Sequence, residues 1–337
     1  MKILVTGGAG FIGSDLVRRL AREGFSVSVI DKLTYAGDIK RIAEVLNMVK
    51  FYKEDITNSK KINEIFEKEK PEIVVHYAAE THVDRSILDP DTFFHTNVIG
   101  TLHLLKASLK YKVKKFIHIS TDEVYGELPL ESKEKFTEKT PLQPNSPYSA
   151  SKASADMLVR SFIETFELPA IIVRASNNYG PWQYPEKLIP LAISKLLSEE
   201  KIPIYGTGQN IRTWLYVEDF TEAILQIIDK GKEGEVYNVG SSEEKENIEV
   251  IKKLLDILNK SENHIEFIPD RPGHDLRYAV DTTKIQKEIG WKPKVSFEEG
   301  LRKTVEWYID NKEWLFEKKK HIDMFVQKLK EEFGKRS

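Results

Sequence analysis

Cysteine is absent from the 337-residue sequence. Without it the chain can form no disulfide, no thiolate metal site and no cysteine nucleophile. No apolar run approaches the roughly 20 residues of a membrane-spanning helix, and Ile3–Val5 is too short for the core of a secretory signal. Lys and Arg number 51 against 53 Asp and Glu, so no excess of positive charge is available for a nucleic-acid backbone. We therefore expect a cytoplasmic globular protein that binds neither nucleic acid nor membrane and holds no metal.

Short apolar runs alternate with longer amphipathic runs through the first half of the chain. Strands are expected at Lys2–Thr6, Ser26–Ile30, Val49–Lys53, Ile73–Tyr77, Phe116–Ser120 and Ala170–Arg174. Helical patterns lie between them at Ile12–Glu23, Ile39–Leu46, Lys60–Glu69 and Thr92–Tyr111. This alternation predicts an α/β fold, a Rossmann-type doubly wound parallel sheet with helices on both faces.

After about residue 175 the pattern loosens, because Pro and Gly interrupt it and short strands such as Glu235–Val239 appear. We expect a smaller, partly interleaved C-terminal α/β substrate lobe. The predicted domains are a Rossmann domain at 1–175, a lobe at 176–311 with some chain returning to the first domain, and a helical tail at 312–337. The tail has apolar residues at helical spacing, which predicts a docked or oligomer-contacting helix: Ile322, Phe325, Val326, Leu329 and Phe333. Ligands of open α/β sheets bind at the carboxyl ends of the strands, so we expect the site in the cleft between the lobes.

A glycine-rich turn at residues 6–13 separates the first strand from the first helix. Gly10 lets a diphosphate approach the backbone, Gly13 allows close helix–strand packing, and the helix N-terminus favours phosphate charge. Asp31 follows the second strand, where a carboxylate accepts hydrogen bonds from ribose hydroxyls and repels a 2′-phosphate. The turn therefore predicts a dinucleotide site that prefers NAD to NADP, although Lys32 softens that preference.

Tyr148 and Lys152 are four residues apart at the start of an apolar helical run, so both side chains lie on one helical face. An ammonium group near a phenol stabilises the phenolate and lowers its pKa, which suits Tyr148 to act as a general base. This pair is common in unrelated helices, but downstream of a dinucleotide turn it becomes a strong signal.

Together the glycine turn, Ala78-Ala79, Asn97 and the Tyr148/Lys152 pair resemble the extended short-chain dehydrogenase/reductase family, whose members act on nucleotide sugars. The resemblance implies a tightly bound NAD. The cofactor contacts that it implies are Gly7, Gly10, Phe11, Ile12, Gly13, Asp31, Lys32, Leu33, Thr34, Asp55, Ile56, Tyr77, Ala78, Ala79, Thr81, Thr96, Tyr148, Lys152 and Asn178.

Two adjacent carboxyl groups follow Thr121 at the end of the fifth strand, and this arrangement resembles the nucleotide-sugar 4,6-dehydratases. The resemblance implies dTDP-glucose as substrate and catalytic roles for Thr121, Asp122, Glu123, Tyr148 and Lys152. Tyr148 would take the proton of the 4-hydroxyl, Glu123 would remove the hydrogen at carbon 5, and a protonated Asp122 would donate to the departing 6-hydroxyl. An elimination needs carboxyl groups in two protonation states, and crowding in a closed site separates their pKa values.

Further segments resemble the same dehydratases and imply where the nucleotide sugar binds. The substrate contacts implied are Thr81, Thr121, Asn177, Lys187, Leu188, Pro203, Tyr205, Arg212, Asn247, Arg271 and His274. Thr213, Leu276 and Gly240-Ser241-Ser242 depart from the family pattern. A homodimer formed through the helices Thr92–Tyr111 and Ser151–Phe166 is likewise implied by the family.

Three alternatives stay open at this point. UDP-glucose could replace dTDP-glucose, because thymine and uracil pockets differ by one methyl group, worth only about 1–3 kcal/mol. A UDP-sugar 4-epimerase or UDP-glucuronate decarboxylase needs no acid pair, so Asp122 and Glu123 argue against it. A non-catalytic NAD-sensing or scaffold protein would have no reason to keep both acids together with Tyr148 and Lys152.

Overall fold

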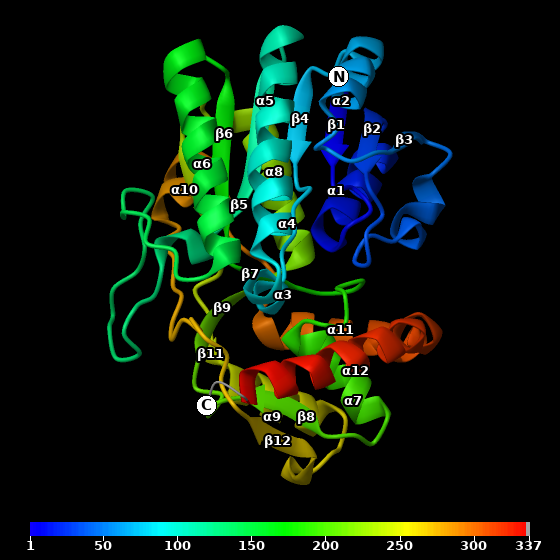
Figure 1. Cartoon of the computed structure of the whole chain (residues 1–337), viewed down its shortest axis with the longest axis vertical. Coiled ribbons are helices and arrows are strands. Elements are labelled where there is room, and N and C mark those ends of the chain that lie inside the picture. Colours follow the sequence, from blue (N-terminus) through cyan, green and yellow to red (C-terminus); the bar gives the residue numbers. More distant parts are fainter. Residues whose placement is uncertain (335–337) are drawn as a thin grey trace.

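The computed structural model describes residues 1–334, and its largest element is a seven-stranded parallel sheet (Figure 1). The strand order is β10-β6-β5-β4-β1-β2-β3. The strands are β1 (Lys2–Thr6), β2 (Ser26–Asp31), β3 (Val49–Lys53), β4 (Ile73–His76), β5 (Lys115–Thr121), β6 (Ala170–Ala175) and β10 (Val236–Val239). The first six agree with the predicted strands within one residue at each end, and the predicted parallel sheet is confirmed. The order reverses beside β1, which lies between β2 and β4, so the ligand crevice is expected there.

Helices cover both faces of this sheet. Successive side chains of a strand point to opposite faces, and because both sets are apolar here, both faces must be buried. Ile3 and Val5 pack with α1 and α8, whereas Leu4 packs with α2, α5 and α6 on the other face. The helices of this lobe are α1 (Phe11–Arg22), α2 (Ser59–Glu69), α3 (Val83–Leu88), α4 (Pro90–Phe94), α5 (Thr101–Lys110), α6 (Pro147–Phe166), α8 (Val217–Lys230) and α10 (Thr283–Glu288).

Two predicted helices differ in kind from the structure. The pattern at Ile39–Leu46 forms a 3₁₀ helix over Ile39–Val45. The pattern at Thr92–Tyr111 forms α4, a π-helical segment at His95–Gly100, and then α5. An apolar period near 3.6 does not separate these helix types, because they differ in backbone hydrogen bonding and not in which face is buried.

The second lobe contains two small sheets. In one, β9 pairs antiparallel with β11 and parallel with β7; in the other, β8 and β12 are parallel. The elements of this lobe are β7 (Asn177–Tyr179), β8 (Ile202–Tyr205), β9 (Ile211–Tyr216), β11 (Glu244–Glu246), β12 (Ile265–Ile268), α7 (Leu188–Leu197), α9 (Asn247–Ile257), α11 (Phe297–Asp310) and α12 (Lys312–Gly334). The strand expected at Glu235–Val239 belongs to the part of the chain that returns to the first lobe. It is β10, which pairs with β6 in the large sheet, because β10, α8 and α10 return to the first lobe.

The predicted tail helix is α12, which packs against α7 and α11 (Figure 1). Its buried side chains include Ile322, Leu329 and Phe333, three of the five apolar residues that predicted it. Residues 335–337 of the predicted tail lie outside the described part of the chain. Among residues 1–334, no helix combines the length and the apolar character needed to cross a membrane.

Candidate active site

The glycine turn joins β1 to α1 and forms a cradle open to an anion. Gly7 has φ +69°, and an added Cβ would lie 2.7 Å from the backbone nitrogen of Ala78. At Gly13 a Cβ would lie 2.3 Å from the carbonyl oxygen of Gly7, so both positions require glycine. No side chain caps the N-terminus of α1, which leaves its first backbone amides available. This geometry fits a diphosphate held at a helix N-terminus.

Asp31 ends β2 beside this turn, and its carboxylate is fixed by backbone amides. Oδ2 accepts a hydrogen bond from Ala9 N at 2.9 Å, and Oδ1 accepts one from Leu33 N at 2.8 Å. Burial raises the pKa of Asp31, and both hydrogen bonds oppose that rise. Lys32 forms an ion pair with Asp55 at 2.6 Å, so its charge has a partner beside the turn. Its effect on the preference against a 2′-phosphate stays a prediction.

One cavity extends from the glycine turn along the carboxyl ends of the strands to Tyr148 and Lys187. Most predicted cofactor and catalytic residues line it: Gly7, Gly10, Phe11, Ile12, Gly13, Asp31, Lys32, Thr34, Asp55, Ile56, Tyr77, Ala78, Ala79, Thr81, Thr96, Thr121, Asp122, Glu123, Tyr148, Lys152 and Asn178. Leu33 is not among the lining residues, and its N–H is bonded to Asp31. The chain therefore gathers both predicted sets around a single cavity.

Sequence reasoning missed several residues of the cavity wall: Arg41, Glu80, Gln183, Tyr184 and Glu186. Arg41 is only 1% exposed; it donates from Nη1 to Ala9 O at 2.9 Å and from Nε to Trp182 O at 3.0 Å. It thus ties the glycine turn to the second lobe. An isolated Arg in an amphipathic run carries no signal for such a role, whereas Glu186 lies within a segment already identified for its neighbour Lys187.

Thr121, Asp122 and Glu123 lie where β5 ends and a 3₁₀ turn begins. Thr121 Oγ1 accepts a hydrogen bond from Glu123 N at 3.2 Å and so caps that turn. Asp122 is 1% exposed, and its Oδ2 has no hydrogen-bond partner. Burial and the Glu123 carboxylate raise the pKa of Asp122 to about 8. Desolvation also raises the pKa of Glu123, but Arg271, Lys187 and Arg212 oppose the rise. The pKa of both carboxyl groups is therefore raised, and the cations that oppose the rise are more numerous around Glu123.

Tyr148 and Lys152 lie in the first turns of α6, both buried, as their spacing predicts. Burial and Glu123 raise the pKa of Tyr148, and a hydrogen bond with Thr121 only partly opposes them. Burial and the nearby acids therefore outweigh any lowering effect of Lys152, so the net pKa of Tyr148 is raised and not lowered as expected. Burial lowers the pKa of Lys152 to about 8, and its Nζ donates to Ile119 O at 2.7 Å, so its charge is directed at a strand carbonyl.

The predicted substrate residues divide into two groups. Thr81, Asn177 and Lys187 line the cavity, and Lys187 Nζ donates to Thr81 O at 3.0 Å. Thr121 also lines the cavity. The other seven predicted residues do not line it, and all of them come from the second lobe: Leu188, Pro203, Tyr205, Arg212, Asn247, Arg271 and His274. Among these, Arg212 and Arg271 act electrostatically on Glu123, which places them near the two adjacent acids.

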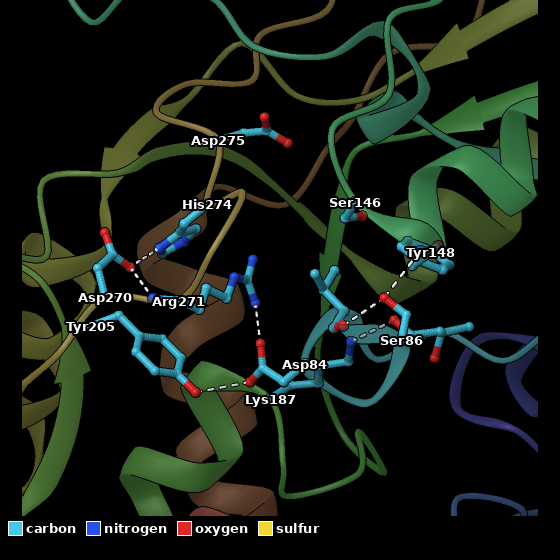
Figure 2. Close-up of polar contacts among 12 residues, drawn as sticks. Asp84, Ser86, Ser146, Tyr148, Lys187, Tyr205, Asp270, Arg271, His274 and Asp275 are labelled. Atoms are coloured by element: carbon cyan, nitrogen blue, oxygen red, sulfur yellow. Dashed lines mark hydrogen bonds and ion pairs between the residues drawn. The ribbon is translucent and has the colours of Figure 1, made fainter. Parts of the chain in front are cut away.

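The side chains of the second group are held in defined orientations. Arg212 donates from Nη2 to Asp275 O at 2.9 Å, and its guanidinium stacks 4.2 Å from the centre of the Tyr278 ring. His274 Nδ1 lies 2.6 Å from Asp270 Oδ1, and burial together with Arg271 lowers the pKa of His274 to about 4. Figure 2 shows Tyr205 and Arg271 directed at the same carboxylate, Asp84.

Two departures from the family pattern leave these contacts in place. Thr213 is fully buried in β9, and its Oγ1 has no hydrogen-bond partner, so a Thr there avoids burying a charge. The Leu276 side chain is 43% exposed, and the hydrogen bond of this residue is made by its backbone N–H, which donates to Glu127 Oε2 at 3.0 Å. No cluster of three or more metal-ligating side chains occurs within residues 1–334.

Known proteins of similar sequence and structure include nucleotide-sugar dehydratases and epimerases. A sequence model of the family described as GDP-mannose 4,6 dehydratase matches residues 4–304. The dTDP-glucose 4,6-dehydratase of Salmonella typhimurium is 48% identical over 94% of this chain and 94% of its own length. A solved dTDP-glucose 4,6-dehydratase from Streptomyces venezuelae, with NAD bound, has a TM-score of 0.90 and 42% identity, covering 93% of this chain and 98% of its own. The UDP-glucose 4-epimerase of Thermotoga maritima has a TM-score of 0.87 at 35% identity, covering 92% and 99%.

Proposed function

The chain belongs to the GDP-mannose 4,6-dehydratase family, and from that premise we propose that it converts dTDP-glucose to dTDP-4-keto-6-deoxyglucose with NAD as cofactor. The main support for this proposal is the pair of adjacent acids, Asp122 and Glu123, whose electrostatic surroundings differ. Asp122, whose pKa is raised to about 8, retains its proton at neutral pH. Burial raises the pKa of Glu123 as well, but three cations, Arg271, Lys187 and Arg212, favour its ionised form. An epimerase has no step that needs such a pair, and identity is lower to the epimerase than to the dehydratases.

The glycine cradle and the Asp31 carboxylate fit a dinucleotide, and the predicted cofactor residues would hold it. When bound, NAD accepts a hydride from carbon 4 and later returns it to carbon 6. Tyr148 takes the proton from the 4-hydroxyl as that carbon is oxidised, with Thr121 bonded to the same oxygen. The resulting ketone acidifies the hydrogen at carbon 5.

The elimination then uses one of the two carboxyl groups as a base and the other as an acid. Glu123 removes the proton from carbon 5, and Asp122 gives its proton to the 6-hydroxyl, which leaves as water and creates a carbon 5–carbon 6 double bond. After hydride addition to carbon 6, Glu123 returns a proton to carbon 5. General acid and base groups of this kind each contribute about 10²–10⁴-fold in rate.

The second lobe would bind the nucleoside diphosphate. Arg212 and Arg271 bring guanidinium groups, which grip phosphate through paired hydrogen bonds, and Tyr205 brings a ring that can stack on a pyrimidine. We also propose the division into a Rossmann domain at 1–175, a substrate lobe at 176–311 and a tail at 312–337, supported by the second lobe's own core.

A homodimer and a cytoplasmic location are part of the same proposal. Exposed apolar side chains gather on the helices expected at the dimer contact: Phe94, Ile99, Leu109, Met157 and Phe166. Sedimentation of the wild-type chain and of Met157→Glu tests the dimer, and a monomeric wild-type chain would contradict it.

One assay tests the reaction. Purified protein is incubated separately with dTDP-glucose, UDP-glucose and UDP-galactose, and the alkali-induced ultraviolet absorbance of a 4-keto sugar is followed. We expect the signal with dTDP-glucose to be the largest. A larger signal with UDP-glucose would reassign the nucleotide, and no keto sugar from any of them would refute the dehydratase proposal.

A further inference from the structure

Asp84 is a buried carboxylate that no step of the proposed reaction uses. It lies in the first turn of α3, in the Rossmann lobe, and is 4% exposed. Both of its side-chain partners come from the second lobe. Tyr205, the last residue of β8, donates from its hydroxyl to Asp84 Oδ2 at 3.0 Å, and Arg271 donates from Nη1 to Asp84 Oδ1 at 2.8 Å (Figure 2).

Asp84 engages only one nitrogen of the Arg271 guanidinium. A guanidinium presents Nε and Nη2 together along one edge, and this edge binds two oxygens of a phosphate at once. With Nη1 on Asp84, that edge makes no hydrogen bond to residues 1–334, and Nε is buried without a hydrogen-bond partner there. The Arg271 backbone N–H donates to Asp270 Oδ1 at 2.8 Å, which fixes the residue at its other end. The side chain is thus fixed by Asp84 while its Nε and Nη2 edge makes no hydrogen bond to the described part of the chain.

The same carboxylate also fixes the Tyr205 ring. Beyond its hydroxyl, the ring is bounded by His274 at 6.0 Å and by Phe333 of α12 at 6.3 Å between ring centres. Burial alone would raise the pKa of Asp84, but Arg271, His82 and the two hydrogen bonds lower it to about 2. The anion that holds both side chains therefore persists throughout the neutral range.

We propose that Asp84 is a positioning residue for the nucleoside diphosphate: it fixes the spacing between the Tyr205 ring and the free edge of Arg271 before substrate arrives. The proposal rests on the proposed function for the identity of the ligand. Ordering these two side chains in advance removes part of the entropy cost of binding, so the effect falls on affinity and not on the chemical step.

The test is calorimetric binding of thymidine diphosphate to wild type and to Asp84→Asn. The amide keeps the shape and can still accept from Tyr205, but it loses the charge that holds Arg271. We expect the Kd to rise roughly 10- to 100-fold, as for loss of a hydrogen bond between charged groups. KM for dTDP-glucose should rise in parallel while kcat changes less than about twofold, and bound NAD per chain should not change.

Two further variants distinguish a positioning role of Asp84 from an ion pair that only stabilises the fold. Asp219→Asn removes another buried carboxylate, 5% exposed, that accepts hydrogen bonds only from backbone amides of Lys294 and Val295. It should leave the Kd unchanged. Arg271→Lys should weaken binding by itself, and adding Asp84→Asn to it should cost less than the product of the two single effects.

Each remaining outcome contradicts the proposal. A Kd unchanged in folded Asp84→Asn would make the ion pair purely structural, and a lower Kd would mean that Asp84 competes with phosphate for Arg271. If Asp84→Asn does not fold, Tyr205→Phe removes only the hydroxyl contact and should raise the Kd several-fold; no rise would overturn the assignment. These binding measurements need no turnover, so their failure can be told apart from a failure of the keto-sugar assay. A wild-type chain that binds no nucleoside diphosphate would refute the proposed function itself.

Discussion

At the scale of single residues, the site depends on how two neighbouring acids are surrounded. Asp122 is enclosed, with one carboxylate oxygen lacking any partner, and its pKa is raised to about 8. Glu123 lines the same cavity but faces Arg271, Lys187 and Arg212, which oppose the effect of desolvation on its pKa. Two residues adjacent in sequence thus have different electrostatic surroundings, although burial raises the pKa of both.

Glu123→Gln tests the role of base. We expect the near-ultraviolet absorbance of reduced nicotinamide to rise on adding dTDP-glucose, because oxidation at carbon 4 does not need Glu123. Keto-sugar formation should fall about 10²–10⁴-fold, since no group removes the carbon 5 proton. Glu131→Gln, at an exposed acid, serves as the control. Normal turnover by Glu123→Gln would show that Glu123 is not the base.

The pH dependence of kcat tests the role of acid. Asp122 donates a proton, so it acts below its pKa of about 8 and loses its function as pH rises through that value. Lys152 also has a pKa of about 8 and loses its charge over the same range. Above pH 8, kcat of the wild type should therefore decline more steeply than expected for the loss of a single proton. In Asp122→Asn the decline should be shallower. An equally steep decline in Asp122→Asn would exclude Asp122 as the group that titrates.

At the scale of elements, α12 connects parts of the chain that lie far apart in sequence. In its first turn Trp314 Nε1 donates to Asp38 Oδ2 at 2.8 Å, beside the cofactor cavity. Further along, Phe325 covers the Arg85 guanidinium at 4.0 Å, and Ile322 is buried against Tyr184 and Leu191. The family match ends at residue 304, so this helix lies beyond the part that the family model describes.

Truncation of one buried side chain tests how firmly α12 is docked. Ile322 is 3% exposed, and Ile322→Ala should lower the free energy of unfolding by about 2–4 kcal/mol, through lost burial and the cavity left behind. Met324→Ala, at a position 65% exposed on the same helix, should change it by less than about 0.5 kcal/mol. Urea unfolding measures both, and equal effects would mean that α12 is not held by its buried face.

At the scale of the whole molecule, the two lobes share the walls of the cofactor cavity. Arg85 of the first lobe pairs with Glu186 of the second at 3.0 Å, and its guanidinium lies 3.9 Å from the centre of the Tyr35 ring. Arg41 reaches from the first lobe to Trp182 O at 3.0 Å. A ligand enclosed by both lobes stabilises the folded chain as a unit, because it binds only when the walls are assembled.

Removal of the cofactor tests this enclosure. Protein stripped of NAD with charcoal should unfold at a lower temperature, and added NAD should restore the transition, by about 2.7 kcal/mol at a hundredfold excess over Kd. NADP should restore little of the unfolding temperature, because Asp31 repels a 2′-phosphate and Lys32 is already paired with Asp55. Scanning calorimetry gives the comparison. Equal stabilisation by both dinucleotides would contradict the assigned role of Asp31.

Much of the fold and the first layer of the site could be predicted, because their signals are local. The six strands follow from runs of apolar residues, and the glycine turn follows from backbone conformations that only glycine adopts freely. The type of helix at His95–Gly100 and the pairing of β10 with β6 could not be predicted, because hydrogen-bond pattern and long-range pairing leave no periodicity in the sequence.

By itself, the sequence determined the sheet, the dinucleotide turn, the shared helical face of Tyr148 and Lys152, and the adjacent acids after Thr121. Each depends on residues within a few positions of one another. Only the tertiary structure decided that Arg41 supports the glycine turn, that burial raises the pKa of Tyr148 despite Lys152, and that Asp84 holds Tyr205 and Arg271. The reason is physical: burial depends on the whole surrounding fold, and contacts between the lobes, such as Arg41 with Trp182 and Tyr205 with Asp84, join residues more than 100 positions apart that share no local sequence pattern.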